Sequence, residues 1–157
     1  MVNPHLRKIL AEIVHSNEIL QNLVSSNFFL VDYANQTSSM SKIMQQAGLG
    51  TRELQENQFY DHLHPDDLQT YRSLWQRLWS GLENEMLVEY RLRCHDGHYI
   101  WARTQCLVIK RLLDGSPSLL VGLDSDISAR KVHESNLQDE LDFYKARLLQ
   151  YEHLREA

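Results

Sequence analysis

The chain has 157 residues, of which 43% are hydrophobic and 24% charged, and its formal net charge is −5. This length suits one domain with extensions, and the apolar share can fill a core, which excludes a globally disordered chain. The acidic balance and the lack of a basic block disfavour nucleic-acid binding, and no apolar run approaches the roughly 20 residues of a membrane helix.

Residues 1–27 are predicted to form an amphipathic N-terminal helix. Its apolar residues recur at three- and four-residue spacing, the heptad pattern of helices that pair with one another. These positions are Leu6, Ile9, Ile13, Leu20 and Leu23. We therefore expect this helix to support a homodimer and to cover the outer face of a sheet, where Leu87, Trp101, Leu107 and Ile109 would lie.

The next segment predicts a short apolar strand over Phe28–Tyr33. A polar turn separates it from Met40–Met44, whose pattern fits either a second strand or the start of a helix. A short helical turn is predicted over Phe59–His64. A longer helix then begins at Pro65, because proline favours the first helical position and aspartates follow it in the first turn, and Gly81 ends it.

The apolar pattern changes to a period of two at Glu85, which is typical of strands. Strand Glu85–Cys94 is followed by Asp96-Gly97, a strong two-residue hairpin turn, and by the return strand Tyr99–Arg111. Apolar groups on both faces of the return strand indicate that both faces of the sheet are covered. A second turn leads into a third strand, Ser118–Leu123.

Ser128–Leu154 is predicted to form a final helix, and residues 129–157 form a C-terminal signalling segment. A heptad seam runs along it, flanked by charged residues, and favours a coiled coil with another helix. The seam consists of Leu137, Leu141, Tyr144 and Leu148, continued by Tyr151.

Three motifs carry a family resemblance. They are Leu63-His64-Pro65-Asp66-Asp67; Glu89-Tyr90-Arg91-Leu92-Arg93 with Asp96-Gly97 and Trp101; and Leu120-Val121-Gly122 with Asp126-Ile127-Ser128-Ala129-Arg130-Lys131. In this order and spacing they resemble the PAS domain, a small sensor module of bacterial signalling proteins. The resemblance implies an α+β fold, a five-stranded antiparallel sheet flanked by helices, with the sensor domain at residues 28–128 between two extension helices.

The resemblance also implies a function. A cytosolic sensory module would detect a small ligand or partner and relay a conformational change through the last helix to an effector beyond Ala157, a diguanylate cyclase or a histidine kinase. The alternative is a ligand-free dimerisation scaffold. Candidate pocket residues are Tyr71, Trp75, Val88, Tyr90, Ala102, Thr104 and Cys106. Candidate relay residues are Trp101, Arg103, Asp126, Ile127 and Ser128, with Arg103 a candidate partner of Asp126.

The sequence contains no catalytic motif, so we do not expect this chain to be an enzyme. One local cluster has metal-ligand residue types: His62, His64, Asp66 and Asp67. The start of the long helix accounts for it, so no metal site is expected. The polar N-terminus is unlike a secretory signal, and the two cysteines form no Cys-x-x-Cys pair, which favours a reduced, cytoplasmic protein.

The cofactor stays open. Haem-binding relatives commonly take an axial histidine from the long helix, but no histidine lies between His64 and His95, so haem is disfavoured. The cysteine segment of light-sensing flavin domains is also absent. Non-covalent flavin against Trp75 and Trp79, another small organic ligand, and no ligand at all remain as alternatives.

Overall fold

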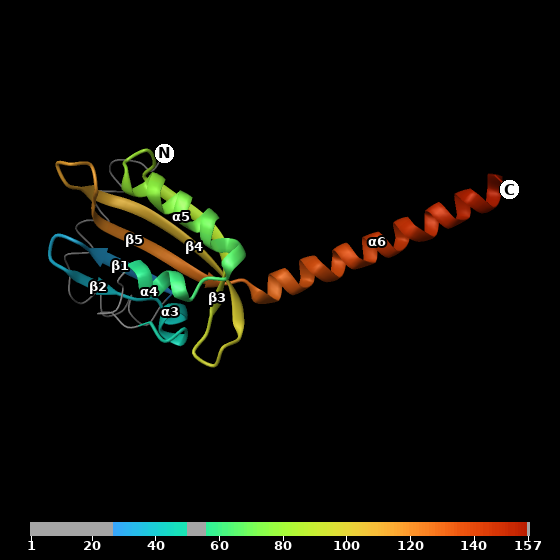
Figure 1. Ribbon diagram of the computed structural model, residues 1–157, viewed down its shortest axis with the longest axis horizontal. Coiled ribbons are helices and arrows are strands. Elements are labelled where there is room, and N and C mark those ends of the chain that lie inside the picture. Colours follow the sequence, from blue (N-terminus) through green and yellow to red (C-terminus); the bar gives the residue numbers. More distant parts are fainter. Residues whose placement is uncertain (1–26, 50–55, 157) are drawn as a thin grey trace. The chain divides into compact units, whose positions relative to one another are not determined.

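The computed structural model describes residues 27–49 and 56–156 (Figure 1). The predicted N-terminal helix, with its five seam positions, lies outside the described residues. The elements in chain order are β1 (Phe28–Asp32), β2 (Thr37–Ser39), α3 (Lys42–Gln46), α4 (Glu56–Asp61), α5 (Pro65–Trp79), β3 (Glu85–Arg93), β4 (Tyr99–Arg111), β5 (Pro117–Asp126) and α6 (Ser128–Glu156).

The five strands form one sheet in the order β2-β1-β5-β4-β3. Every neighbouring pair is antiparallel, and β5, the last strand in the chain, lies at the centre between β1 and β4. This confirms the predicted five-stranded antiparallel sheet. The main core lies between one face of this sheet, called here the inner face, and helices α3, α4 and α5 (Figure 1).

The two-residue period of β3 and β4 determines the inner face. Alternate residues of β3 are buried, and their partners on β4 are buried as well, except for the half-buried Ile100 opposite Leu92. These inner-face residues are Met86, Val88, Tyr90 and Leu92 on β3, and Ala102, Thr104, Cys106 and Val108 on β4. Five of the candidate pocket residues therefore share this face: Val88, Tyr90, Ala102, Thr104 and Cys106.

Two predicted elements had clearly shifted bounds. The strand predicted over Ser118–Leu123 is β5, which continues to Asp126. Its polar end interrupts the apolar pattern, yet the backbone still pairs with β4, as in Thr104↔Asp124. The second is α4, which begins at Glu56 rather than at Phe59.

The segment Met40–Met44 is the start of α3, while the second strand lies just before it as β2. Ser41 is the N-cap residue of α3, with extended backbone angles, and its hydroxyl accepts a hydrogen bond from the Met44 backbone N–H at 3.4 Å. Met40 and Met44 are both buried. The short helix α3 therefore buries Ile43 and Met44 in the core, and Met40 is buried just before it.

The predicted helix start at His64 is confirmed, and it also closes an edge of the sheet. The Asp67 carboxylate accepts hydrogen bonds from the Arg91 backbone N–H at 2.8 Å and from Arg91 Nε at 2.9 Å. Nearby, the Arg93 backbone N–H donates to the His62 carbonyl at 2.8 Å. Because β3 is an edge strand, these bonds occupy polar backbone groups that could otherwise pair with another chain.

These contacts also explain why residues 62–67 include histidines and aspartates, the residue types that can bind a metal. Arg91 forms ion pairs with Asp66 and Asp67, and its guanidinium lies 5.3 Å from the centre of the Trp101 ring. Across the described ranges, no group of three or more His, Cys, Asp or Glu side chains is placed to hold a metal ion.

The described residues up to Asp126 form one compact unit, and those from Ile127 onward form a second. The second unit consists mainly of α6, which begins at Ser128. The apolar seam of α6 is open to solvent, with exposed fractions of 52% at Leu137 and 48% at Leu141. Tyr144 and Leu148 are exposed too. No helix in the described part of the chain is long and apolar enough to cross a membrane.

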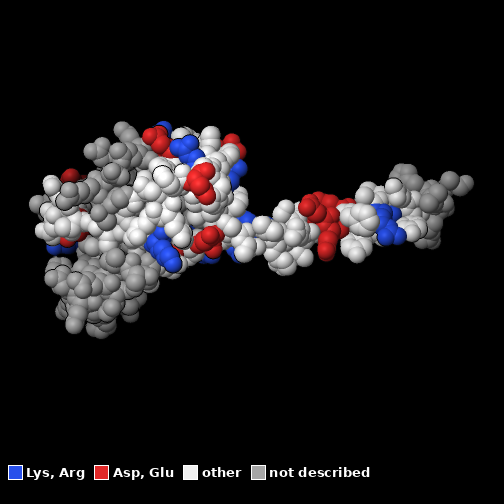
Figure 2. Space-filling model, turned by 90° about the horizontal axis from the view of Figure 1, so that it is seen from below, with Lys and Arg blue, Asp and Glu red and all other residues white. Residues whose placement is uncertain are grey.

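Surface charges of both signs are interspersed. On the described part of the face shown in Figure 2, Lys and Arg side chains alternate with Asp and Glu side chains and form no continuous basic patch. A surface of this kind gives little electrostatic attraction for a phosphate backbone.

Candidate ligand-binding cavity

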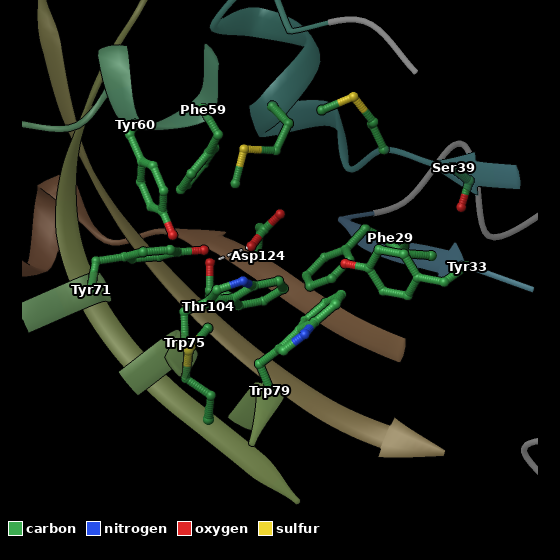
Figure 3. A pocket seen from close by; sticks show the side chains of 14 residues that line it. Phe29, Tyr33, Ser39, Phe59, Tyr60, Tyr71, Trp75, Trp79, Thr104 and Asp124 are labelled. Atoms are coloured by element: carbon green, nitrogen blue, oxygen red, sulfur yellow. Dashed lines mark hydrogen bonds between the residues drawn. The ribbon is translucent and has the colours of Figure 1, made fainter. Parts of the chain in front are cut away.

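A cavity of about 190 Å³ lies between the inner face of the sheet and the helices (Figure 3). Half of the residues that line it are aromatic, three are methionines, and a buried carboxylate lies at its wall. The lining residues are Phe29, Val31, Tyr33, Ser39, Met40, Met44, Phe59, Tyr60, Tyr71, Trp75, Trp79, Met86, Thr104 and Asp124.

The aromatic rings hold one another in place by tilted and edge-to-face contacts. The Tyr71 ring centre lies 5.0 Å from that of Phe59 and 5.1 Å from that of Tyr90. On the other side of the cavity, Tyr33 and Trp79 meet edge-on with ring centres 5.0 Å apart. Such contacts are favourable geometries for aromatic pairs, so the walls of the cavity are built from mutually supported rings.

Asp124 anchors a polar network at the cavity wall. Its carboxylate accepts hydrogen bonds from the Ser41 hydroxyl and from the Thr104 hydroxyl, each at 2.5 Å, and it is fully buried. Thr104 in turn lies 2.9 Å from the Tyr90 hydroxyl. Because the Thr104 hydrogen is directed to Asp124, the Tyr90 hydroxyl donates to Thr104. The network thus connects α3, β3, β4 and β5.

The buried charge shifts the ionisation of its surroundings. Burial raises the pKa of Asp124, although the hydrogen bonds from Ser41 and Thr104 oppose this rise. Burial also raises the pKa of the Tyr71 phenol well above its usual value, as do the charges of Tyr90 and Asp124. Burial, and then the charge of Asp124, raise the pKa of the Cys106 thiol to about 12. The phenol and the thiol therefore stay neutral, which suits recognition rather than nucleophilic attack.

Three of the seven pocket residues predicted from the sequence line the cavity: Tyr71, Trp75 and Thr104. The other four, which are Val88, Tyr90, Ala102 and Cys106, are buried on the inner face but do not appear among the described lining residues. Tyr90 nevertheless acts on the cavity, because it donates to Thr104.

Sequence reasoning missed Asp124, the one carboxylate of the described cavity wall. The signal was the alternation along β5, where Leu120, Gly122 and Asp124 occupy every second position. Because the predicted strand ended at Leu123, Asp124 was not assigned to the inner face. Residues from β1 and α3, such as Phe29 and Met44, were missed as well, because their segment matches the family motifs poorly.

Gly122 permits a close approach between β1 and the centre of the sheet. It pairs with Phe29, and a Cβ at Gly122 would lie 2.1 Å from Cζ of the Phe29 ring. A side chain at this position is therefore incompatible with the observed ring position. The glycine lets Phe29 lie over β5 and form part of the cavity wall.

The candidate relay residues lie on both faces of the sheet. Arg103 pairs with Ser125, whereas Asp126 pairs with Ala102, an inner-face residue. Since paired residues of neighbouring strands share a face, the side chains of Arg103 and Asp126 start from opposite faces. Trp101 precedes the buried Ala102 and is half-buried on the outer face.

The size of the described cavity favours a ligand smaller than a flavin. An apolar cavity of roughly 150 Å³ holds a single benzene ring, and sites for drug-sized ligands span roughly 300–1,000 Å³. At about 190 Å³, the cavity holds one ring with a short substituent rather than three fused rings. None of its described lining residues is a histidine, so those residues offer no imidazole ligand to a haem iron.

Comparison with known proteins identifies the architecture. The sequence model of the PAS fold family matches residues 38–123. No protein among those with curated functions matches the chain.

Several solved structures share the fold at low sequence identity. A sensory box histidine kinase/response regulator from Burkholderia thailandensis aligns with a TM-score of 0.60 and 20% identity over 81% of this chain and 98% of that chain. The N-terminal domain of a diguanylate cyclase with PAS/PAC sensor from Marinobacter aquaeolei aligns with a TM-score of 0.53 and 20% identity, over 66% and 96%. A light-oxygen-voltage domain studied with a flavin analogue reaches 0.50 at 14% identity, over 82% and 98%. The family match spans more than half of the sequence and agrees with the observed sheet, so this chain belongs to the PAS fold family.

Proposed function

We propose that this chain is the sensory module of a bacterial signalling protein and that it binds a small organic ligand in the cavity. The observation that carries the proposal is the cavity itself, an aromatic enclosure with a buried carboxylate at its wall. Ligand sites in proteins combine apolar walls with a few placed polar groups in this way. PAS domains are sensory modules, and we assign no catalysis to this chain.

The proposed signal leaves through β5. This strand carries Asp124 at the cavity, and Asp126 ends it directly before Ile127 and the first residue of α6, Ser128. A ligand that changes the packing around Asp124 therefore acts four residues from the start of the output helix. The ligand must bind two conformations with different affinities for this change to occur.

The proposed effector is a diguanylate cyclase or a histidine kinase joined to the C-terminal end of the chain. Two proteins of similar fold carry those names, which supports the proposal. We further propose that the protein works in the cytoplasm as a homodimer through the seam of α6, whose apolar residues are exposed in the described chain. Dimer contacts through residues 1–27 remain part of this proposal.

The ligand-free scaffold is the second candidate, and the same exposed seam favours it. In that case the domain would only pair subunits and align their α6 helices. The two candidates differ in whether occupation of the cavity matters.

A ligand screen with a cavity-blocking variant tests the proposal. Native mass spectrometry and thermal unfolding of the purified chain should reveal a compound that binds and raises the unfolding temperature. Val31→Phe places a ring in the cavity and should remove that response. The matched control Val132→Phe makes the same change at an exposed position of α6 and should retain it. An unchanged response in Val31→Phe, or no binding compound at all, would favour the scaffold.

A further inference from the structure

Asp124 brings a carboxylate to the cavity, and the described part of the wall holds no cation to balance its charge. None of the described lining residues is Lys, Arg or His. The two groups that bond to the carboxylate are neutral hydroxyls, on Ser41 and Thr104. A buried carboxylate without an opposite charge is unfavourable, because hydroxyls replace only part of its lost hydration. A cationic ligand would therefore stabilise the ionised form of Asp124, whose pKa burial raises.

The network also determines which hydrogen-bonding role remains for a ligand. Tyr90 donates to Thr104, and Thr104 and Ser41 donate to the two carboxylate oxygens of Asp124. An ionised carboxylate can accept about four hydrogen bonds, so it retains acceptor capacity after these two. In this ionised form it has no hydrogen of its own to give. A ligand that approaches Asp124 must therefore be a donor.

The aromatic walls favour the same ligand chemistry. In Figure 3 the Asp124 carboxylate lies among aromatic side chains, with Phe59, Tyr60 and Tyr71 toward one side and Phe29 and Trp79 toward the other. The faces of such rings attract cations within about 6 Å of the ring centre, and tryptophan does so most strongly. Aromatic rings around a carboxylate thus complement a positive group with an apolar body.

We propose that this cavity binds a small organic cation, an ammonium group carried on one aromatic ring or a compact alkyl body, with Asp124 as its counter-ion. The volume of about 190 Å³ sets the size limit, since a cavity of roughly 150 Å³ holds benzene. This inference rests on the proposed sensory function and adds the chemical class of the ligand. Anions of the same size are disfavoured, because the ionised form of Asp124 would repel them.

Three probes of matched shape test the charge preference. Benzylamine is a cation at neutral pH, benzyl alcohol is neutral and benzoate is an anion, while each carries one ring and one further carbon. We expect calorimetric titration of the whole chain to give a dissociation constant for benzylamine roughly tenfold or more below that of benzyl alcohol. Benzoate should not bind. This comparison uses the unmodified protein and needs no variant.

Two variants test which side chains cause the preference for a cation. Asp124→Asn should raise the dissociation constant of benzylamine roughly tenfold or more and leave that of benzyl alcohol nearly unchanged. Because Asp124→Asn perturbs a buried network, Trp79→Leu provides an independent test at a position where the side chain is 38% exposed. This variant should weaken the binding of benzylamine more than the binding of benzyl alcohol. The matched control, Asp139→Asn, removes one exposed charge from α6 and should change neither probe.

The outcomes separate this inference from the sensory function on which it rests. If benzyl alcohol binds as tightly as benzylamine, or benzoate binds better than either, the cation preference is refuted while the sensory proposal stands. If neither the three probes nor any screened compound enters the cavity, the sensory proposal fails as well. If Asp139→Asn weakens benzylamine as much as Asp124→Asn does, the attraction comes from overall charge and the assignment to Asp124 is wrong.

Discussion

Gly122→Ala should destabilise the protein through a single methyl group. Its Cβ would lie 2.1 Å from Phe29 Cζ and 2.7 Å from the Gln105 carbonyl oxygen. Favourable contacts between carbon atoms are about 3.5–4.0 Å, so the ring must withdraw by about 1.4 Å or more, and the Gln105 backbone has less freedom to move. Overpacking of this kind costs about 1–3 kcal/mol.

Urea denaturation measures this cost. With a slope of about 2 kcal/mol per M, the midpoint should fall by about 0.5–1.5 M. Because Phe29 also lines the cavity, displacement of its ring should weaken benzylamine binding in the same variant. The change perturbs the contact between β1 and β5, where Phe29 and Gly122 are paired residues, and the contact with Gln105 on β4.

A double-mutant cycle with Phe29→Leu identifies the cause. The smaller side chain should recover part of the stability lost in Gly122→Ala, while the clash with the Gln105 carbonyl remains. The reasoning is refuted if Gly122→Ala unfolds at the same urea concentration as the original protein, or if the two substitutions are strictly additive.

Three further predictions concern other parts of the chain. Burial of Asp67 opposes its ionisation, but the hydrogen bonds and charge of Arg91 outweigh it and lower the pKa of Asp67 below 3.8. Asp67→Asn should therefore cost about 1–2 kcal/mol at neutral pH, and the difference should vanish as the pH falls through the lowered pKa, measured by urea denaturation. Cys106, whose pKa is raised to about 12, should resist a disulfide-exchange reagent that labels the half-exposed Cys94. Leu141→Lys should abolish dimers detected by light scattering while leaving benzylamine affinity unchanged.

A different result would contradict each of these three predictions. If the Asp67→Asn variant is still less stable than the original protein in acid, the charge of Asp67 is not the source of the stability difference. Labelling of Cys106 at the rate of Cys94 would contradict its burial. A Leu141→Lys variant that remains dimeric would remove α6 from the interface, and residues 1–27 would then carry the proposed pairing.

The strongest sequence signals were those in which local pattern and tertiary burial agree. The alternation in Glu85–Arg93 predicted a buried face because that face does pack against helices. The proline and aspartates at Pro65 predicted a helix start, since their preference for a first turn is local. The role of Asp67 in closing the edge of β3 was not predictable, because it depends on a contact between residues 24 positions apart.

The cavity was harder to predict for a related reason. Asp124 interrupts an apolar run, and local pattern alone treats such a residue as the end of a strand. Only the network with Ser41 and Thr104 makes its burial tolerable, and those donors come from α3 and β4. The ambiguity of Met40–Met44 has the same origin, since five residues carry too little periodicity to separate a strand from a helix.

The central position of β5 has a consequence for how the molecule assembles. Both β1 and β4 pair with a strand that is synthesised after them, so β1–β2 and β3–β4 are separate hairpins until residues 117–126 are present. The bond between Ser41 and Asp124 joins positions 83 residues apart, a separation that slows closure. The hydrophobic inner face therefore stays open to other chains until a late step, and a truncation within β5 should yield an aggregating product rather than a smaller domain.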